Sequence, residues 1–173
     1  MAPLLRAALY GALFVALLAL AAGQFLAGFG AATPRILGIL QVVGIAATLS
    51  GSALALWCVF LFARFGRGTP IPIDPPRQLV VDGPYKVVRN PMAVGVAIAL
   101  SGVAAYYESV AFLVAVGLFM VGIHAMIVLY EEPTLRRTFG DEYVAYCNSV
   151  RRWLPGGRGL STQRPPDGTN VSV

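Results

Sequence analysis

Apolar residues fill most of this chain in long, nearly uninterrupted blocks. Four blocks stand out, at residues 7–29, 36–62, 92–107 and 110–130. A helix needs roughly 20 apolar residues to cross the hydrocarbon core of a bilayer, and the third block is shorter, about 24 Å long as a helix. The pattern predicts an all-α, polytopic membrane protein with four transmembrane helices, the last two forming a hairpin around Glu108.

Small residues repeat within the second block. Gly44, Thr48 and Ser52 recur every four residues, so they share one face of the predicted helix. Small side chains let helices approach one another closely in lipid. Gln41 is a polar residue in the same block, and an amide between helices or at the interface is favoured over a functional role.

The polar segments differ in character from one another. Residues 64–90 form a connector rich in proline, glycine and charge, which predicts irregular backbone. After residue 133, apolar residues return at nearly helical spacing among charges, which predicts amphipathic C-terminal helices with a break at Gly140. Residues 156–173 lack periodicity and are expected to be a disordered tail. One membrane domain is therefore expected over residues 1–155.

Composition and charge set the expected topology. The chain has 173 residues, of which 57% are hydrophobic and 12% charged, and its mean hydropathy is +0.72. The formal net charge is +5, and basic residues gather in the connector and after the fourth block, whereas the turn at Glu108 has none. The positive-inside rule then places both termini and the connector in the cytoplasm. No nucleic-acid partner is expected.

Metal and disulfide chemistry find little support in the sequence. His124 is the single histidine, and the two cysteines, Cys58 and Cys147, form no metal-binding motif. No zinc site of the usual kind is expected. One cysteine lies in an apolar block and the other near the charged tail, so a disulfide between them is not expected either.

The acidic pair Glu131–Glu132 is the first candidate for chemistry, because it shares a membrane face with the connector. Two carboxylates at the C-terminal end of a membrane helix oppose the helix dipole, by about 0.3–1 kcal/mol each. Either they form a solvated cluster compensated by Arg136 and Arg137, or one of them receives a ligand's ammonium through a charge-assisted hydrogen bond. In the second case the connector forms the opposite wall of a ligand pocket.

Other candidates surround this pair, each with two interpretations. Tyr85 stacks on an aromatic ligand or anchors the chain at the interface. Arg89 pairs with a ligand carboxylate or extends to lipid headgroups. His124 precedes Glu131 by seven residues, on much the same helix face, and is either a packed residue or a functional group in the membrane. The free N–H groups of the helix that begins at Pro91 suit an anionic or carbonyl group.

Two blocks of sequence carry recognisable motifs. The first matches the pattern LV…G.Y…RHP.Y.G through Leu79-Val80, Gly83, Tyr85, Arg89-Asn90-Pro91 and Gly95. The second matches the pattern EE..L...FG..Y..Y...V.R..P through Glu131-Glu132, Leu135, Phe139-Gly140, Tyr143, Tyr146, Val150, Arg152 and Pro155. Together the two blocks resemble the superfamily of isoprenylcysteine carboxyl methyltransferases and phospholipid methyltransferases, over residues 78–155.

The resemblance implies an S-adenosylmethionine-dependent methyltransferase in the plasma membrane of a bacterium. By position, the implied cofactor contacts are Gln78, Leu79, Val80, Tyr85, Asn90, Pro91, Met92 and Glu132. Arg89, Glu131 and His124 are the candidate catalytic residues. The acceptor is expected to be a lipophilic or small molecule with a carboxylate, thiol or amine. Only a thiol or an amine would need a proton acceptor, for which Glu131 and His124 are candidates.

The sequence departs from the superfamily pattern at several positions. Asn90 stands in place of the usual histidine, and Ala93 in place of the following tyrosine. Asparagine keeps hydrogen bonding but cannot titrate, and the alanine removes one aromatic wall. Ile127 and Val128 occupy the region where the eukaryotic prenylcysteine branch has a basic substrate-binding residue. A prenylcysteine acceptor therefore does not follow from the resemblance.

Two rival functions make different predictions. A membrane reductase of related fold would bind NADPH, whose phosphates need a cluster of cations, and the acidic pair would repel them. A non-catalytic membrane protein would need no closed polar pocket between the connector and Glu132. Binding of S-adenosylhomocysteine or of NADPH to the purified protein separates these functions.

Overall fold

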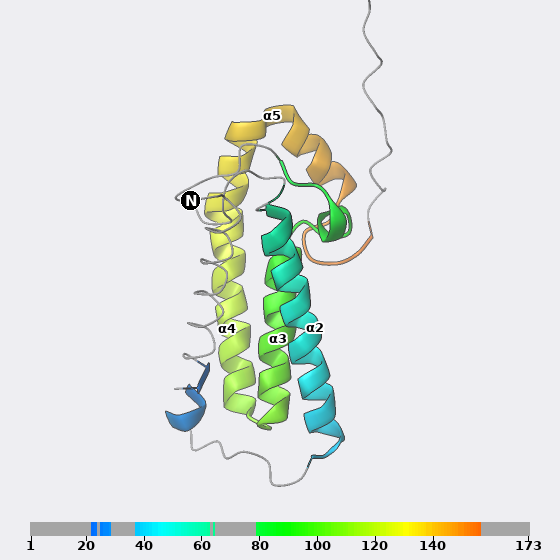
Figure 1. Cartoon of the computed structure of the whole chain (residues 1–173). Helices are drawn as coiled ribbons and strands as arrows, with labels where there is room; N and C mark the ends of the chain where they lie inside the picture. The colour runs from blue at the N-terminus through cyan, green and yellow to red at the C-terminus, as the bar shows by residue number, and fades with distance from the viewer. Residues whose placement is uncertain (1–21, 24, 29–36, 63, 65–78, 157–173) are drawn as a thin grey trace, which may run out of the picture.

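The computed structural model describes residues 22–23, 25–28, 37–62, 64 and 79–156, and every regular element in these ranges is helical (Figure 1). The principal helices are α2 (Ile39–Leu61), α3 (Pro91–Tyr106), α4 (Val110–Met126) and α5 (Glu132–Ser149). A 3₁₀ turn, Gly83–Lys86, lies in the connector, and a π-helical stretch, Ile127–Glu131, joins α4 to α5. The all-α class is confirmed for the described part of the chain.

The second, third and fourth apolar blocks form α2, α3 and α4. Two helical segments are long and apolar enough to cross a membrane, Ile39–Leu61 and the continuous run Val110–Ser149. Helix α3 is apolar but has only 16 residues. The first apolar block lies mostly outside the described residues, although residues 22–23 and 25–28 are helical.

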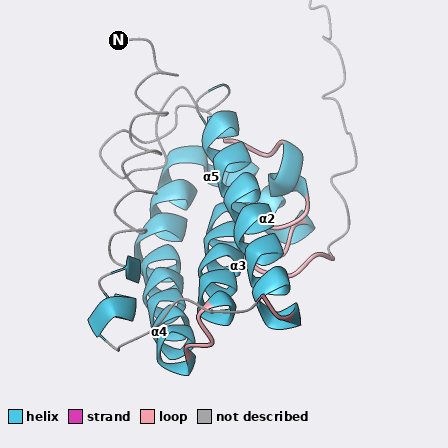
Figure 2. Ribbon diagram, turned by 60° about the horizontal axis from the view of Figure 1, so that its bottom comes forward, coloured by secondary structure: helices cyan, strands magenta, loops and turns pink. Residues whose placement is uncertain are grey.

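Helices α2, α3 and α4 run side by side, and α5 crosses one end of them (Figures 1 and 2). Helices α2 and α3 approach closely through small residues. A Cβ added at Gly51 would lie 2.5 Å from the Gly95 carbonyl oxygen, and one at Gly102 would lie 2.5 Å from that of Gly44. The Thr48 hydroxyl, between them, donates to the Ala99 carbonyl at 3.3 Å. The small-residue face predicted around Gly44 and Thr48 is therefore the α2–α3 interface.

The end of the bundle away from α5 is closed by polar contacts. The Gln41 side-chain amide donates to Glu108 at 2.6 Å and accepts from the Gly38 N–H at 3.0 Å. Glu108 has a φ of 51°, in the left-handed region, and makes the predicted turn between α3 and α4. The Ser109 hydroxyl caps α4 by accepting from the Phe112 N–H at 3.2 Å. Gln41 is thus an amide between helices, as the sequence predicts.

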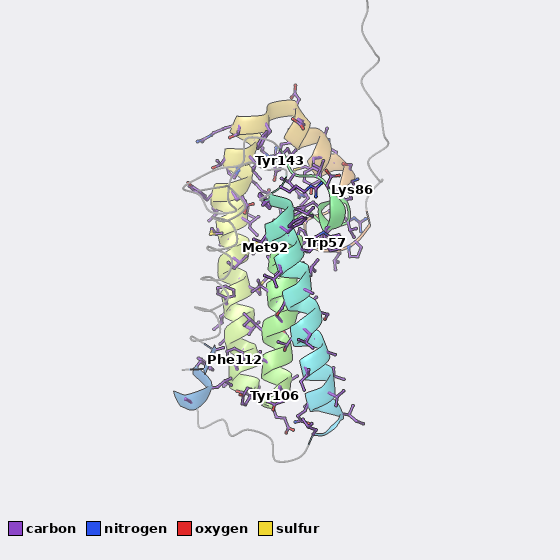
Figure 3. All side chains as sticks on the ribbon, viewed as in Figure 1. Trp57, Lys86, Met92, Tyr106, Phe112 and Tyr143 are labelled. Atoms are coloured by element: carbon purple, nitrogen blue, oxygen red, sulfur yellow. The ribbon has the colours of Figure 1, made fainter. Side chains whose placement is uncertain are left out.

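The connector is fastened between α2 and α5 by two apolar clusters. One cluster joins the end of α2 to the connector through Cys58, Leu61, Val80 and Tyr85. The other joins α5 to the connector through Tyr143, Tyr146 and Val150, with Leu79 and Val81 packed against them. Figure 3 shows Trp57, Lys86, Met92 and Tyr143 at this end, and Tyr106 and Phe112 at the other. Both cysteines are free, and α5 kinks at Gly140 as predicted.

Candidate active site

The connector is joined by hydrogen bonds to the last part of α5 and to the segment that follows it, although about 60 residues separate them in sequence. The partners are the Arg89 N–H with the Arg151 carbonyl (2.9 Å), the Asn90 N–H with the Arg152 carbonyl (3.3 Å), and the Tyr146 hydroxyl with the Tyr85 carbonyl (2.7 Å). These bonds bring the two family-like motifs together at the end of the bundle where α5 begins.

Glu132 is the centre of this region, just past the apolar block at residues 110–130, with 8% of its surface exposed. Arg152 donates to both of its carboxylate oxygens, at 2.8 and 3.0 Å, and Arg89 Nη1 lies 3.3 Å from Oε1. Burial alone would raise the pKa of Glu132, but the hydrogen bond from Arg152 and the charges of the two arginines outweigh it and lower the pKa. The carboxylate is therefore held as an anion.

Glu131, the neighbouring carboxylate, is only partly buried and has the opposite tendency. Burial, followed by the charge of Glu132, raises the pKa of Glu131. The two adjacent acids are thus differentiated by their surroundings. Glu132 serves as a fixed negative charge, whereas Glu131 is the better proton acceptor of the pair.

Arg89 points into the protein rather than outward. Its side chain is 13% exposed, and Nη1 donates to Cys147 Sγ at 2.7 Å as well as approaching Glu132. Its Nε is buried and has no hydrogen-bond partner among the described residues. The alternative in which Arg89 extends to lipid headgroups is therefore wrong. A buried donor without an acceptor is costly, so this atom marks a place suited to a ligand oxygen.

Tyr85 has its ring in the interior. The residue is 6% exposed, and its ring meets Phe62 edge-on at a centroid distance of 5.5 Å. An exposed interfacial anchor is therefore not what the structure shows, and the ring lies in the same cluster as Val80 and Met92. Burial is also the first cause that raises the pKa of the Tyr85 hydroxyl.

The remaining expected cofactor contacts are divided between two places. Leu79 packs against the α5 cluster, whereas Pro91 is fully buried at the first position of α3. Asn90 precedes α3 and contributes its backbone N–H to the Arg152 carbonyl. Gln78 lies outside the described residues.

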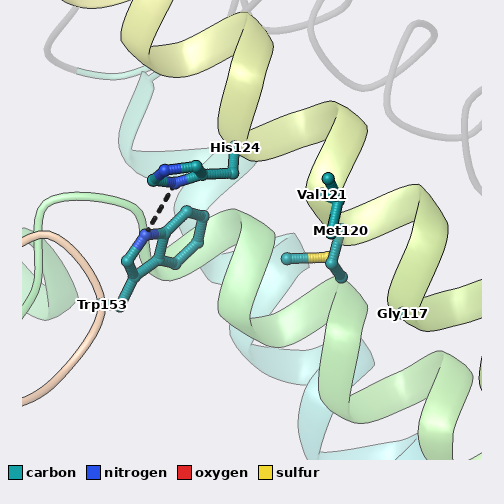
Figure 4. A pocket seen from close by; sticks show the side chains of 5 residues that line it. All are labelled: Gly117, Met120, Val121, His124 and Trp153. Atoms are coloured by element: carbon teal, nitrogen blue, oxygen red, sulfur yellow. Dashed lines mark hydrogen bonds between the residues drawn. The ribbon is translucent and has the colours of Figure 1, made fainter.

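His124 has Trp153, rather than Arg89 or Glu132, as its hydrogen-bond partner. Its Nδ1 accepts a hydrogen bond from Trp153 Nε1 at 3.2 Å, beside a separate cavity on α4 (Figure 4). The π-helical stretch Ile127–Glu131 lies between His124 and Glu132 and adds one residue to its turn, so Glu132 rather than Glu131 takes the position equivalent to seven α-helical residues from His124. The described residues contain no cluster of three or more His, Cys, Asp or Glu side chains that could hold a metal ion.

Sequence reasoning missed three residues of this region. Arg152 is the principal partner of Glu132, Cys147 accepts from Arg89, and Trp153 contacts His124. Arg152 belongs to the second motif, so the sequence marked this residue but assigned it no role. For Cys147 and Trp153 the sequence offers no such signal.

Comparison with protein families defines the class. The phospholipid methyltransferase family profile matches residues 37–142, more than half of the 173-residue chain. The chain therefore belongs to the phospholipid methyltransferase family, which confirms the resemblance read from the motifs. The match begins just before α2, so it reaches further toward the N-terminus than the motifs alone. Neither a curated protein nor a solved structure matches the chain significantly.

Proposed function

We propose that this protein transfers a methyl group from S-adenosylmethionine to a lipophilic or small-molecule acceptor at the cytoplasmic membrane interface. The acceptor group is a carboxylate, thiol or amine. One observation supports this most directly. Where the two motifs meet, the anionic Glu132 lies beside Arg89, whose buried Nε has no acceptor among the described residues.

The residues present fit the cofactor's amino-acid end. An ionised carboxylate accepts about four hydrogen bonds, and Glu132 receives two from Arg152 and a longer contact from Arg89. Glu132 can therefore also meet an ammonium, and Arg89 Nε suits a carboxylate. The apolar connector side chains suit the adenosine part. In this proposal the cofactor is held by Gln78, Leu79, Val80, Tyr85, Asn90, Pro91, Met92 and Glu132.

When bound, the cofactor supplies a methyl group already activated by its sulfonium sulfur. The chain mainly has to hold donor and acceptor in line, which is a large source of rate acceleration. A carboxylate acceptor needs no base. For an amine or thiol acceptor, Glu131 is the proton acceptor in this proposal, because its pKa is raised and it adjoins Glu132.

The proposed topology has four membrane crossings with both termini in the cytoplasm of a bacterium. Helix α2 and the Val110–Ser149 run supply two crossings by length and composition, and α3 is apolar but shorter. Arg89 and Arg152 lie at the end where α5 crosses, whereas the opposite end carries Glu108. This asymmetry agrees with the positive-inside rule. Residues 1–155 then form one domain, followed by a tail at 156–173.

The test is cofactor binding to the purified protein in detergent. Calorimetry should show binding of S-adenosylhomocysteine and none of NADPH. Glu132→Gln should weaken S-adenosylhomocysteine binding at least tenfold, about 1.4 kcal/mol, because a charge-assisted contact is lost. Glu142→Gln, at an exposed position of the same helix, should bind as the wild type does.

Thermal unfolding of each variant is needed beside these titrations, because removing Glu132 leaves two arginines without their partner. A folded Glu132→Gln protein with wild-type affinity would remove the cofactor assignment. Binding of NADPH rather than of S-adenosylhomocysteine would favour the membrane reductase over the methyltransferase as the function of this protein.

A further inference from the structure

The guanidinium of Arg89 is held through one of its three nitrogens. Its Nη1 donates to Cys147 Sγ at 2.7 Å, and this is the one hydrogen bond of the Arg89 side chain within the part of the chain that the structure describes. Glu132 Oε1 lies 3.3 Å from the same Nη1, as an ion pair rather than a hydrogen bond. Glu132 takes its two hydrogen bonds from Arg152 instead. Cys147 is therefore the group that fixes the direction of the Arg89 guanidinium.

The remaining edge of this guanidinium is suited to an anion. A guanidinium is planar, and its five N–H groups point outward in a fixed fork. Nη1 is the terminal nitrogen on the side of Cδ, so Nε and Nη2 form a second edge to which Nη1 does not belong. Nε is buried and lacks an acceptor among the described residues. A carboxylate can accept two parallel hydrogen bonds from such an edge.

Cys147 is itself held in place by the last part of α5. Its side chain is half-buried and packs against the apolar cluster that joins α5 to the connector. The preceding residue, Tyr146, donates its hydroxyl to the Tyr85 carbonyl at 2.7 Å. The Arg89 N–H donates to the Arg151 carbonyl at 2.9 Å, just beyond the end of α5. The backbones that carry the thiol and the guanidinium are thus fastened to each other on both sides of the contact.

The second cysteine of the chain shows how a cysteine that only packs is placed. Cys58 is 0% exposed and lies in an apolar cluster with Leu61 and Val80. Cys147 is only partly buried and accepts a hydrogen bond from a cation. A thiol sulfur is a weak acceptor for neutral donors, and a charged donor strengthens the bond. The surroundings of Cys147 are therefore those of a residue that orients a charge.

We propose that Cys147 is a positioning residue for the methyl donor. Its sulfur orients Arg89 so that the guanidinium binds the carboxylate of S-adenosylmethionine, and Cys147 itself touches neither donor nor acceptor. The inference rests on the proposed methyl transfer and adds a residue that the motifs leave open. Position 147 is one of the three unspecified positions between Tyr146 and Val150 in the second motif.

Three substitutions separate orientation of Arg89 from packing. Cys147→Ala removes the acceptor of Arg89 Nη1. Cys147→Ser keeps an acceptor on a side chain of the same shape and should restore most of the lost function. Asn148→Ala changes the next residue of α5, which is exposed, and is the control.

The probes are S-adenosylhomocysteine and its decarboxylated form, which keeps the adenosine, the thioether and the ammonium. Calorimetry on the full-length protein in detergent should show that the wild type binds S-adenosylhomocysteine at least about tenfold more tightly than the decarboxylated form. In Cys147→Ala the affinity for S-adenosylhomocysteine should fall about tenfold, whereas the affinity for the decarboxylated form should not change. Cys147→Ser should bind both nearly as the wild type does, and Asn148→Ala should match the wild type.

Several results would overturn the inference. Equal affinity of the wild type for the two ligands would mean that the carboxylate is not bound. An equal loss of both affinities in Cys147→Ala would indicate a packing role alone. Failure of Cys147→Ser to recover the affinity would show that an acceptor at this position is not what matters. Unchanged S-adenosylhomocysteine binding in Cys147→Ala would refute the inference and leave the proposed function standing.

Thermal unfolding tests the contact between Arg89 and Cys147 without any ligand. The loss of Tm in the double variant Arg89→Gln/Cys147→Ala should be smaller than the sum of the two single losses, because one contact can be lost only once. Additive losses would contradict the contact and overturn the inference. A wild type that binds neither ligand would refute the proposed function and the role of the donor here, and non-additive losses would then leave only the contact standing.

Discussion

Glycine has opposite roles in two regions of this molecule. At Gly44, Gly51, Gly95 and Gly102 an added Cβ would lie only 2.5–2.8 Å from the backbone of the facing helix. At Gly117 and Gly122 of α4 it would meet nothing within 4 Å. In the α2–α3 pair, glycine permits close contact of two backbones. In α4 it leaves space beside the helix, and at Gly117 that space is the cavity.

The two regions also differ in the forces that hold them. The α2–α3 pair depends on close packing and on a neutral hydrogen bond from Thr48. The region around α5 depends on buried ions, because Glu132 binds both Arg89 and Arg152. The α2–α3 pair is thus a closely packed support, whereas the region around α5 is a site of buried charges beside open space. Substitutions and low pH should therefore affect the α2–α3 pair and the α5 region differently.

The largest effect should come from Gly102→Val. The added side chain would collide with the Gly44 carbonyl and the Thr48 backbone, which cannot move without separating α2 from α3. We expect a loss of about 3 kcal/mol of unfolding free energy, measured by denaturant titration in detergent micelles. Gly122→Val is the control and should lose far less. Equal losses would mean that the α2–α3 contact is no tighter than the α4 surface.

A smaller effect should follow acidification. The pKa of Glu132 in the folded protein lies below its ordinary value of 4.5, so the stability it contributes is present above that value and is lost as pH falls through the folded pKa. The raised pKa of Glu131 acts in the opposite direction, which makes a comparison with Glu132→Gln necessary. The difference in thermal unfolding between wild type and variant should begin to shrink near pH 4.5 and disappear below the folded pKa of Glu132. A gap that persists in acid would contradict the ion-pair account.

The smallest effect should be a gain. Gly122→Ala should raise the unfolding free energy by about 0.5–1 kcal/mol, because alanine restricts the unfolded chain and favours the helix. The same substitution at Gly102 should destabilise, since even one methyl group meets the Gly44 carbonyl at 2.5 Å. Paired thermal unfolding curves would check the opposite signs. A destabilised Gly122→Ala protein would show that this face of α4 is covered.

The helices and their ends were largely predictable from the sequence. Long apolar blocks define α2, α3 and α4, because lipid demands internal backbone hydrogen bonding and apolar side chains. The turn at Glu108, the amide contact of Gln41 and the kink at Gly140 also followed from residue type. Each of these features is local, or is forced by the membrane.

The charge partners of the acidic pair were less predictable. Nearness in sequence suggested Arg136 and Arg137, and both are exposed. The charge of Arg136 contributes to the lowered pKa of Glu132, but Arg152 takes the direct contact after the chain reverses through α5. That contact depends on the Gly140 kink and also on hydrogen bonds between Arg151, Arg152 and the connector, and no short-range pattern encodes those hydrogen bonds. The buried ring of Tyr85 likewise depends on Phe62, which directly follows α2 and is 23 residues earlier in the sequence.

The π-helical stretch has a consequence for insertions and deletions in the gene. The Glu132 N–H donates to the Ile127 carbonyl, five residues back, so this turn holds one residue more than an α-helical turn. Loss of a single codon here would convert this turn into an ordinary α-helical turn, so α5 would keep its orientation about the helix axis. The same loss elsewhere in α4 would rotate α5 by about 100° and turn Glu132 away from Arg89. Tolerance of the chain to a single-residue deletion should therefore be highest at this turn.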